Sequence, residues 1–335
     1  ALCAQLRKEL EAEGVEVKDV PIGVMVETPA AAVLAHELAK EAGHTGNYGL
    51  FDQLCALQWV RANIGAFGGD ADNLTIMGQS AGAMSVQQLC LTPLAEGLFA
   101  KAVMSSGGGV SKMLSAKPVE ELYPFWENVM AKAGCADLAA LRTVAPESLF
   151  TAWQEAKKEC KNAMATSGPA QDGVFICKPG TEVVAAGEQR HIPYMIGMTS
   201  EDIMPPILYT MVKGWCKTQD EQNGPACYGW FFDRQLPGDK NGAWHSSDLW
   251  YWFGTLGHCW RPFTATDKVL SVQMVTYLTN FAKTGNPNGG GMPTWAPLDA
   301  AHAKVLRLGE QPPHMGKASL AKLAWTMLTN KAVGE

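Results

Sequence analysis

Short apolar runs and helical patterns follow one another along this chain. Residues 74–77 form a run that fits one buried strand, and residues 81–91 directly after it have the pattern of a helix. Three later apolar runs predict further strands over residues 101–105, 192–198 and 228–234. The alternation of such strands with helical segments predicts an α/β protein.

The first forty residues have a pattern of their own. Leu2, Leu6 and Leu10 recur at four-residue spacing among charged residues, which predicts a helix with one apolar face. Residues 15–27 read as a strand, and Thr28 with Pro29 supplies the capping residue and first-turn proline of a helix that runs to residue 40. These elements make one helix-strand-helix unit of a β/α repeat.

Composition narrows the classes of partner. The chain has 335 residues, 47% of them hydrophobic, which is enough for the core of one large domain or two ordinary ones. Its net charge is −6 and it has no basic run, so we expect neither nucleic acid nor an anionic membrane as a partner. No apolar stretch reaches spanning length and no leader pattern stands at the N-terminus, so we expect a cytoplasmic protein. These properties leave the oligomeric state open.

The cysteines predict reduced thiols rather than a disulfide framework. Their number is odd and they are scattered without a Cys-x-x-Cys pair. Neither they nor the seven histidines have the spacing of a zinc site, so no structural metal is expected. The nine positions are Cys3, Cys55, Cys90, Cys135, Cys160, Cys177, Cys216, Cys227 and Cys259.

A serine between two glycines stands where the first predicted strand meets its helix. The motif is Gly78-Gln79-Ser80-Ala81-Gly82, and a strand-turn-helix context of this kind is the nucleophile elbow of serine hydrolases. The turn must be tight enough to strain Ser80, so both glycines are expected to allow close packing of the backbone. The alternative is a turn of small residues without chemistry.

Three more motifs precede the elbow, and together with it they resemble the type-B carboxylesterase/lipase family of the α/β-hydrolases. The resemblance covers residues 42–335, about 290 of the 335 residues, and it implies a sheet in which the four predicted strands are neighbours. Residues 242–251 are most similar to the bacterial branch described as cinnamoyl or feruloyl esterases. The motifs are Gly46-Asn47-Tyr48-Gly49-Leu50-Phe51-Asp52-Gln53, Trp59-Val60-Arg61-Ala62-Asn63-Ile64 and Phe67-Gly68-Gly69-Asp70.

Residues 1–41 resemble a different family and are expected to be a separate piece. The stretch from Pro21 to Ala32 is similar to the phosphoenolpyruvate-binding barrel of PEP-utilising enzymes such as enzyme I of the sugar phosphotransferase system. The resemblance implies that Glu27 is a magnesium ligand. However, the family's second carboxylate ligand and its catalytic cysteine loop do not follow, and one carboxylate is a poor site for magnesium with a phosphorylated substrate. We therefore expect no binding of phosphoenolpyruvate or magnesium.

The esterase resemblance implies a catalytic triad in the chain order serine, acid, histidine. Ser80 is the expected nucleophile, and Asp202, five residues after Gly197, is the expected acid, with Glu201 as the alternative. His245 lies in a glycine-led loop after the last predicted strand and is the expected base. The backbone N–H of Ala81 is the expected oxyanion donor, and no cofactor is required.

The same resemblance implies an esterase that lacks the family's oxyanion loop. About a hundred residues with the first strands of the sheet and a His-Gly-Gly loop would precede residue 42 in the family, and they are not in this sequence. Gly107-Gly108-Gly109 has no preceding histidine, so we expect a flexible turn there. We therefore expect weak hydrolysis of small esters, with cinnamoyl-type acyl groups as candidate substrates. The alternatives are an esterase-like fragment or binding module without catalysis, and, with less support, a PEP- and magnesium-dependent phosphotransferase.

Overall fold

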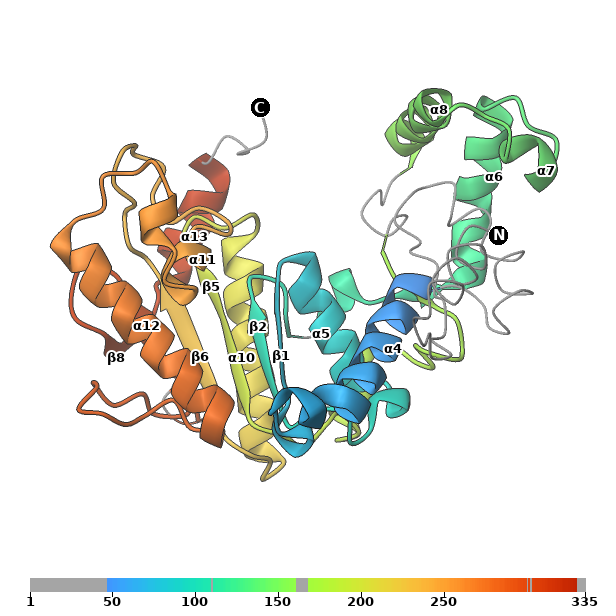
Figure 1. Cartoon of the computed structure of the whole chain (residues 1–335). Coiled ribbons are helices and arrows are strands. Elements are labelled where there is room, and N and C mark those ends of the chain that lie inside the picture. The colour runs from blue at the N-terminus through green and yellow to red at the C-terminus, as the bar shows by residue number, and fades with distance from the viewer. Residues whose placement is uncertain (1–46, 110, 161–167, 300, 302, 330–335) are drawn as a thin grey trace, which may run out of the picture.

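A six-stranded sheet organises the chain (Figure 1). The computed structural model describes residues 47–109, 111–160, 168–299, 301 and 303–329. The strand order is β1-β2-β5-β6-β7-β8, and the strands are parallel except for β8, which pairs antiparallel with β7. The strands are β1 (Thr75–Gln79), β2 (Lys101–Ser105), β5 (Tyr194–Thr199), β6 (Cys227–Phe232), β7 (Val305–Leu308) and β8 (His314–Gly316).

The prediction of four neighbouring strands is confirmed, because β1, β2, β5 and β6 are adjacent in this order. β2 has the predicted ends, and the ends of the other three strands differ from the apolar runs by one or two residues. β1 extends beyond the run to Gln79, since its parallel pairing with β2 continues to Gln79 opposite Ser105. β6 ends at Phe232, and Arg234 instead pairs with Asp267 at the start of a helix. The helix-strand-helix unit expected over the first forty residues lies outside the described residues.

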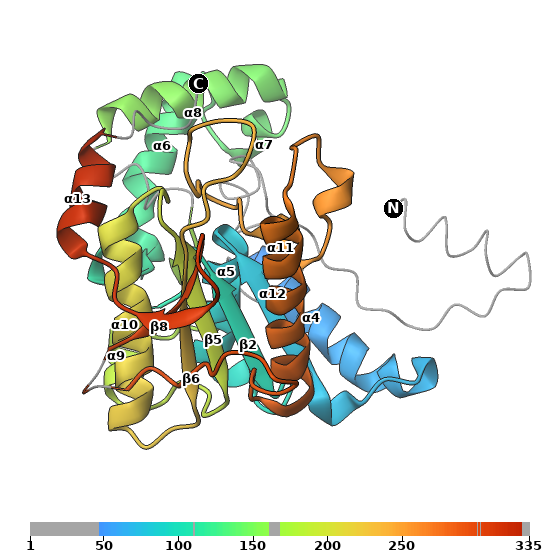
Figure 2. The same cartoon turned by 90° about the vertical axis from the view of Figure 1, so that its left-hand side faces the viewer.

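Helices connect the strands and cover both faces of the sheet (Figure 2). A two-stranded ladder of β3 (Lys117–Pro118) with β4 (Ala170–Gln171) lies apart from the main sheet. None of the described helices is both long and apolar enough to cross a bilayer. The helices are α4 (Tyr48–Asn63), α5 (Ala81–Leu91), α6 (Tyr123–Lys132), α7 (Leu138–Leu141), α8 (Pro146–Glu159), α9 (Gly180–Ala185), α10 (Pro205–Glu221), α11 (Leu249–Trp252), α12 (Ala265–Thr284) and α13 (Leu320–Thr329).

Alternation along the strands divides the core into two clusters, because successive side chains of a strand point to opposite faces. On β5, Tyr194, Ile196 and Met198 pack with α5, α9 and α10. Met195 faces the other way and packs with the cluster formed by α11 and α12. The sheet is therefore the middle of three layers, with α10 and α12 on opposite sides (Figure 2).

A third cluster belongs to a small helical lobe made of α6, α7 and α8. In Figure 1 this lobe stands apart from the sheet and its covering helices. Its core is separate from the two clusters of the sheet, and α6 packs directly on α8. The buried residues are Phe125, Val129, Leu141, Leu149, Ala152 and Ala156.

The parallel strands bring three separate loops to one edge of the sheet. β1 ends directly before Ser80, β5 ends shortly before Asp202, and the loop after β6 carries His245. Because parallel strands end at the same edge, residues far apart in sequence meet there, and this edge is where ligands bind in open α/β sheets.

Candidate active site

Ser80 occupies a strained turn between β1 and α5. Its backbone φ is 57° and its ψ is −123°, a conformation that residues other than glycine rarely adopt. Two backbone hydrogen bonds hold the turn. The N–H of Ser80 donates to the carbonyl of Ser105 at 2.8 Å, and the N–H of Met84 donates to the carbonyl of Ser80 at 3.1 Å. The strain expected of a nucleophile elbow is present.

The two elbow glycines are not equally crowded. A Cβ added to Gly78 would lie 2.2 Å from the carbonyl oxygen of Gly82, whereas a Cβ added to Gly82 would meet no described atom within 4 Å. Our expectation that close packing requires both glycines is therefore wrong for Gly82. The strand and the first turn of the helix approach each other at Gly78 alone, because that is where their backbones cross.

We predict that Gly78→Ala destabilises the protein and Gly82→Ala does not. In Gly78→Ala the new methyl meets backbone atoms, which cannot rotate away, so the free energy of unfolding should fall by about 1 to 3 kcal/mol. Thermal unfolding of the two variants beside the parent checks this. Equal midpoints for Gly78→Ala and the parent would contradict the packing argument.

The turn at residues 107–109 is close-packed rather than flexible, contrary to our expectation. All three glycines are buried. A Cβ on Gly107 would lie 2.2 Å from the carbonyl oxygen of Ser80, and a Cβ on Gly109, whose φ is 91°, would lie 2.6 Å from the carbonyl oxygen of Met211. The absence of side chains lets this turn pack behind the nucleophile.

Ser80, His245 and Asp202 form a connected chain of hydrogen bonds. The Nε2 of His245 lies 2.8 Å from the Oγ of Ser80, and its Nδ1 lies 2.6 Å from Oδ1 of Asp202. A hydrogen bond from Nδ1 to Asp202 keeps the ring proton on Nδ1, so Nε2 can accept the proton of the serine hydroxyl. The three residues expected from the sequence are thus brought together in the expected order.

Asp202 is held as an ionised acceptor. Its Oδ2 accepts from the N–H and hydroxyl of Thr199 at 3.2 and 2.9 Å, and its Oδ1 accepts from the N–H of Ile203 at 2.9 Å. Burial by itself would raise the pKa of Asp202, but the hydrogen bond from His245 and its other donors lower the pKa below the usual value. A carboxylate that stays charged can stabilise the imidazolium formed during catalysis.

The pKa of His245 is raised above its usual value. Burial works in the opposite direction, but the hydrogen bond to Asp202 and the charges of Asp202 and Asp248 outweigh it. A histidine with a raised pKa is a stronger base, which suits the removal of a proton from Ser80.

Two residues beside the histidine were not singled out from the sequence. Asp248 is fully buried and accepts from the Ser105 hydroxyl at 3.2 Å and the Trp252 indole at 3.0 Å. Burial raises its pKa to about 6. Gln79 places its Nε2 atom 3.2 Å from Nε2 of His245. Gln79 lies in the elbow motif and Asp248 lies in residues 242–251, but the spacing of residues in these motifs does not mark either one as part of the site.

Glu201 does not contact the imidazole of His245 by any described hydrogen bond. Its carboxylate instead accepts from the backbone N–H of Ala243, at 2.8 Å, in the loop that carries the histidine. The geometry thus favours Asp202 over Glu201 as the partner of the ring.

Ala81 is the first residue of α5, directly after Ser80. The N–H groups of a helix's first turn have no carbonyl partner within the helix, and the positive end of the helix dipole lies there. The N–H of Ala81 is therefore available for an oxyanion that forms at Ser80.

A cavity of about 130 Å³ lies beside the elbow. It is bounded by α5, by the turn at Gly107 and by Met211 of α10. Its lining combines apolar side chains with the amides of Gln87 and Gln88. Gly107 packs against the carbonyl oxygen of Ser80, but Ser80, Asp202 and His245 do not line this cavity.

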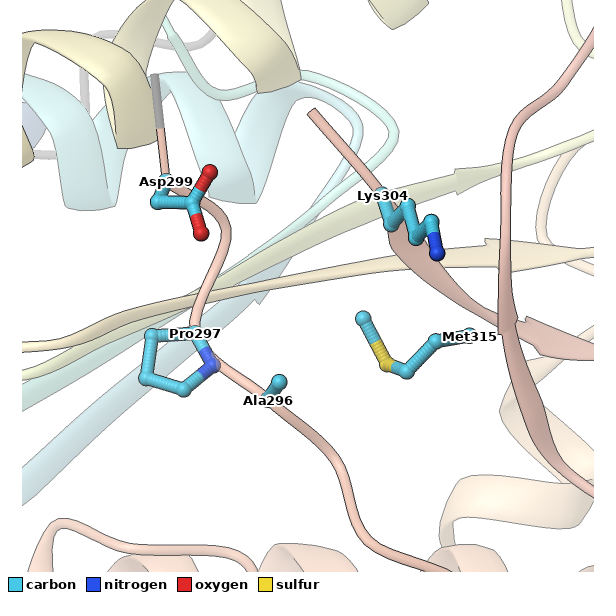
Figure 3. A pocket seen from close by; sticks show the side chains of 5 residues that line it. All are labelled: Ala296, Pro297, Asp299, Lys304 and Met315. Carbon is cyan, nitrogen blue, oxygen red and sulfur yellow. The ribbon is translucent and has the colours of Figure 1, made fainter. Parts of the chain in front are cut away.

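Another depression, of about 230 Å³, lies between residues 296–299 and the β7–β8 hairpin (Figure 3). Asp299 and Lys304 stand on opposite sides of it in Figure 3, with Met315 beside Lys304. None of the expected site residues lines this depression. We locate the candidate site at the elbow because the hydrogen bonds that join Ser80, His245 and Asp202 lie there.

Within the described part of the chain, no group of three or more His, Cys, Asp or Glu side chains could hold a metal ion. Glu27, the residue that the second resemblance implies as a magnesium ligand, lies outside that part.

Two family models match the sequence. The model of the carboxylesterase family matches residues 37–224 and 210–323, and that of the PEP-binding domain of PEP-utilising enzymes matches residues 1–45. The first match covers most of the chain and includes all three residues of the hydrogen-bonded relay.

Similar proteins and structures agree with the first match. The sequence is 27% identical to pyrethroid hydrolase Ces2e of Rattus norvegicus, over 87% of this chain and 62% of that protein. It is 26% identical to cocaine esterase of Homo sapiens, over 80% of this chain and 59% of that protein. The chain thus spans about three fifths of the length of these curated relatives. A solved PNB esterase aligns with a TM-score of 0.70 and 23% identity, covering 92% of this chain and 73% of the other, which shows the α/β-hydrolase fold.

Proposed function

The chain belongs to the carboxylesterase family, and from that premise we propose that it hydrolyses small carboxylic esters through an acyl-enzyme on Ser80. The observation that carries this proposal is the relay of 2.8 and 2.6 Å hydrogen bonds from Ser80 through His245 to Asp202. We propose further that residues 42–335 form the esterase domain and that residues 1–41 are a separate piece.

In the proposed reaction, the Oγ of Ser80 attacks the ester carbonyl carbon while Nε2 of His245 takes the hydroxyl proton. The negative charge that develops on the carbonyl oxygen is stabilised by the N–H of Ala81. The carbon–oxygen bond to the alcohol then breaks, and His245 returns the proton to the leaving alkoxide. Water, deprotonated by the same nitrogen, attacks the acyl carbon; the bond from that carbon to Oγ then breaks, and His245 gives the proton to Oγ, which releases the acid and restores Ser80.

For the substrate, we propose esters with a planar aromatic acyl group of the cinnamoyl type. The cavity beside the elbow supports this, because Met84, Ile176 and Met211 give it apolar walls. The amides of Gln87 and Gln88 can hydrogen-bond a polar substituent on a ring. Comparing kcat/KM for acetate, butyrate and cinnamate esters of one alcohol tests this choice. A preference for acetate would contradict it.

Hydrolysis of p-nitrophenyl acetate by the purified full chain tests the proposed activity itself. Turnover above background, together with stoichiometric labelling by an organophosphonate, is the expected result. A folded protein that binds such esters without turnover and resists labelling would favour the alternative, an esterase-like binding module.

The activity should fall in acid at a pH above the usual titration point of histidine. His245 must be neutral to accept the serine proton, and its pKa is raised above 6.5. Protonation therefore sets in at a higher pH than for an unperturbed imidazole, and kcat/KM should decline as the pH falls through a value above 6.5. A pH profile from about pH 5 to about pH 9 checks this. A midpoint below 6.5 would contradict the raised pKa of His245.

A further inference from the structure

The loop that carries His245 is attached to Glu201 by two hydrogen bonds. The backbone N–H of Glu201 donates to the carbonyl of Ala243 at 3.0 Å, and the N–H of Ala243 donates to Oε2 of Glu201 at 2.8 Å. Glu201 also forms an isolated parallel β-bridge with Trp244, the residue before His245. The side chain and the main chain of Glu201 thus act on the same short stretch.

The fit between Glu201 and this loop is close. Gly242 has a φ of 70°, and a Cβ added to it would lie 2.5 Å from the carboxyl carbon of Glu201. The hydroxyl of Ser200 donates to the same Oε2 atom. Oε1 of Gln235 accepts from the N–H of Gly242 at 3.0 Å. The partly buried Glu201 carboxylate therefore lies against Gly242 and has two defined donors.

Ala243 shows why the side chain matters. The residue is 0% exposed, so its N–H has no ready access to water if the carboxylate is removed. A buried donor without an acceptor costs free energy, and a loop can avoid that cost by moving. Because His245 is two residues further along, such a movement would change the 2.8 Å and 2.6 Å contacts of its ring.

The strand that precedes Glu201 is held firmly in the sheet. β5 lies inside the sheet between β2 and β6, and the N–H of Ser200 donates to the carbonyl of Phe232 at 2.9 Å. Two consecutive carboxylates therefore leave the end of a rigid strand. Asp202 contacts the imidazole itself, and Glu201 contacts the backbone that carries it.

We propose that Glu201 is a positioning residue that holds the loop of residues 242–245 so that His245 reaches both Ser80 and Asp202. This assignment rests on the proposed esterase function. It gives the second acid of the Glu-Asp pair a role that is distinct from that of the triad acid.

The experiment compares Glu201→Ala, Glu201→Gln and the parent in the full-length chain. Glu201→Ala should lower kcat by about tenfold to a hundredfold with KM nearly unchanged, the size expected for losing a hydrogen bond to a charged group. The amide oxygen of Glu201→Gln can still accept from Ala243, so this variant should keep most of the activity. Glu188→Ala, which truncates an exposed glutamate paired with Lys178, is the matched control and should behave as the parent.

The pH profile separates positioning from a general loss of folded protein. If Glu201→Ala loosens the bond between His245 and Asp202, the pKa of His245 falls toward its usual value and the acid limb of kcat/KM moves to lower pH. Asp248, the other carboxylate whose charge acts on His245, is unchanged in this variant. A lower kcat with an unmoved acid limb would mean that Glu201 only stabilises the fold, and that result would overturn the proposal.

A spectroscopic readout does not depend on turnover. The proton on Nδ1 of His245, shared with Asp202 at 2.6 Å, should give a downfield proton resonance in the parent and in Glu201→Gln. The resonance should be lost or moved upfield in Glu201→Ala. An unchanged resonance there would also overturn the proposal. If the parent shows this resonance but hydrolyses no ester, the esterase function fails while the positioning of His245 by Glu201 is still tested.

Discussion

Replacing Ser80 with alanine should reduce the hydrolysis of p-nitrophenyl acetate to the uncatalysed background. The substitution removes the nucleophilic oxygen that lies 2.8 Å from His245 and adds no bulk. Loss of the nucleophile costs on the order of 10⁶ in kcat in the serine protease subtilisin. Covalent labelling by an organophosphonate should disappear as well, since the label attaches to the same oxygen. Initial rates and intact-protein mass spectrometry measure the two effects.

The control is Ser85→Ala, which removes a hydroxyl from α5, the helix that begins directly after Ser80. It should retain both turnover and labelling. If Ser80→Ala retains the parent rate, the acyl-enzyme mechanism is eliminated for this chain. High activity in the parent would contradict our expectation of weak hydrolysis and would require a second oxyanion donor besides Ala81.

Replacing Asp202 with asparagine should lower kcat by a factor of about 10⁴, the effect of the same change in the Ser-His-Asp triad of serine proteases. An asparagine amide can donate to Nδ1 of His245, which places the remaining proton on Nε2. The ring then points a proton, not a lone pair, at Ser80. Without the carboxylate the pKa of His245 should also fall, because the hydrogen bond and charge of Asp202 are what raise it against burial.

The measurement is kcat for Asp202→Asn over the pH range used for the parent. Asp137→Asn, an exposed aspartate in the helical lobe, is the matched control. If Asp202→Asn keeps the parental kcat while Glu201→Gln loses it, the two acids have been assigned to the wrong roles.

Much of the fold could be predicted from the sequence because the inner strands β2, β5 and β6 are buried on both faces. β2 and β5 are buried at every position, so each appears as a short run of mainly apolar residues between polar turns. The elbow was visible for a related reason. Ser80 sits at a strand-to-helix junction, and that context lies within a dozen neighbouring residues.

What the sequence did not indicate depends on contacts between distant residues. The turn at 107–109 looked flexible because three glycines stand together, but Gly107 packs on Ser80 and Gly109 packs on Met211. Gly82 looked as constrained as Gly78, and the difference arises only where the two backbones cross. Asp248 and Glu201 differ from surface carboxylates only through the residues that the fold brings to them.

The parallel topology also makes the site a late product of folding. His245 meets a serine 165 positions earlier and an aspartate 43 positions earlier, so the relay exists only after long stretches of chain have closed into loops. Closing such loops lowers the entropy of the chain before the contacts that compensate for this loss can form. Proteins dominated by non-local pairings therefore fold slowly. Reactivity at Ser80 therefore reports more than chemistry. The fraction of chains whose Ser80 reacts equals the fraction in which β1, β5 and the segment after β6 have all reached their native positions. Partly folded chains with intact helices do not react.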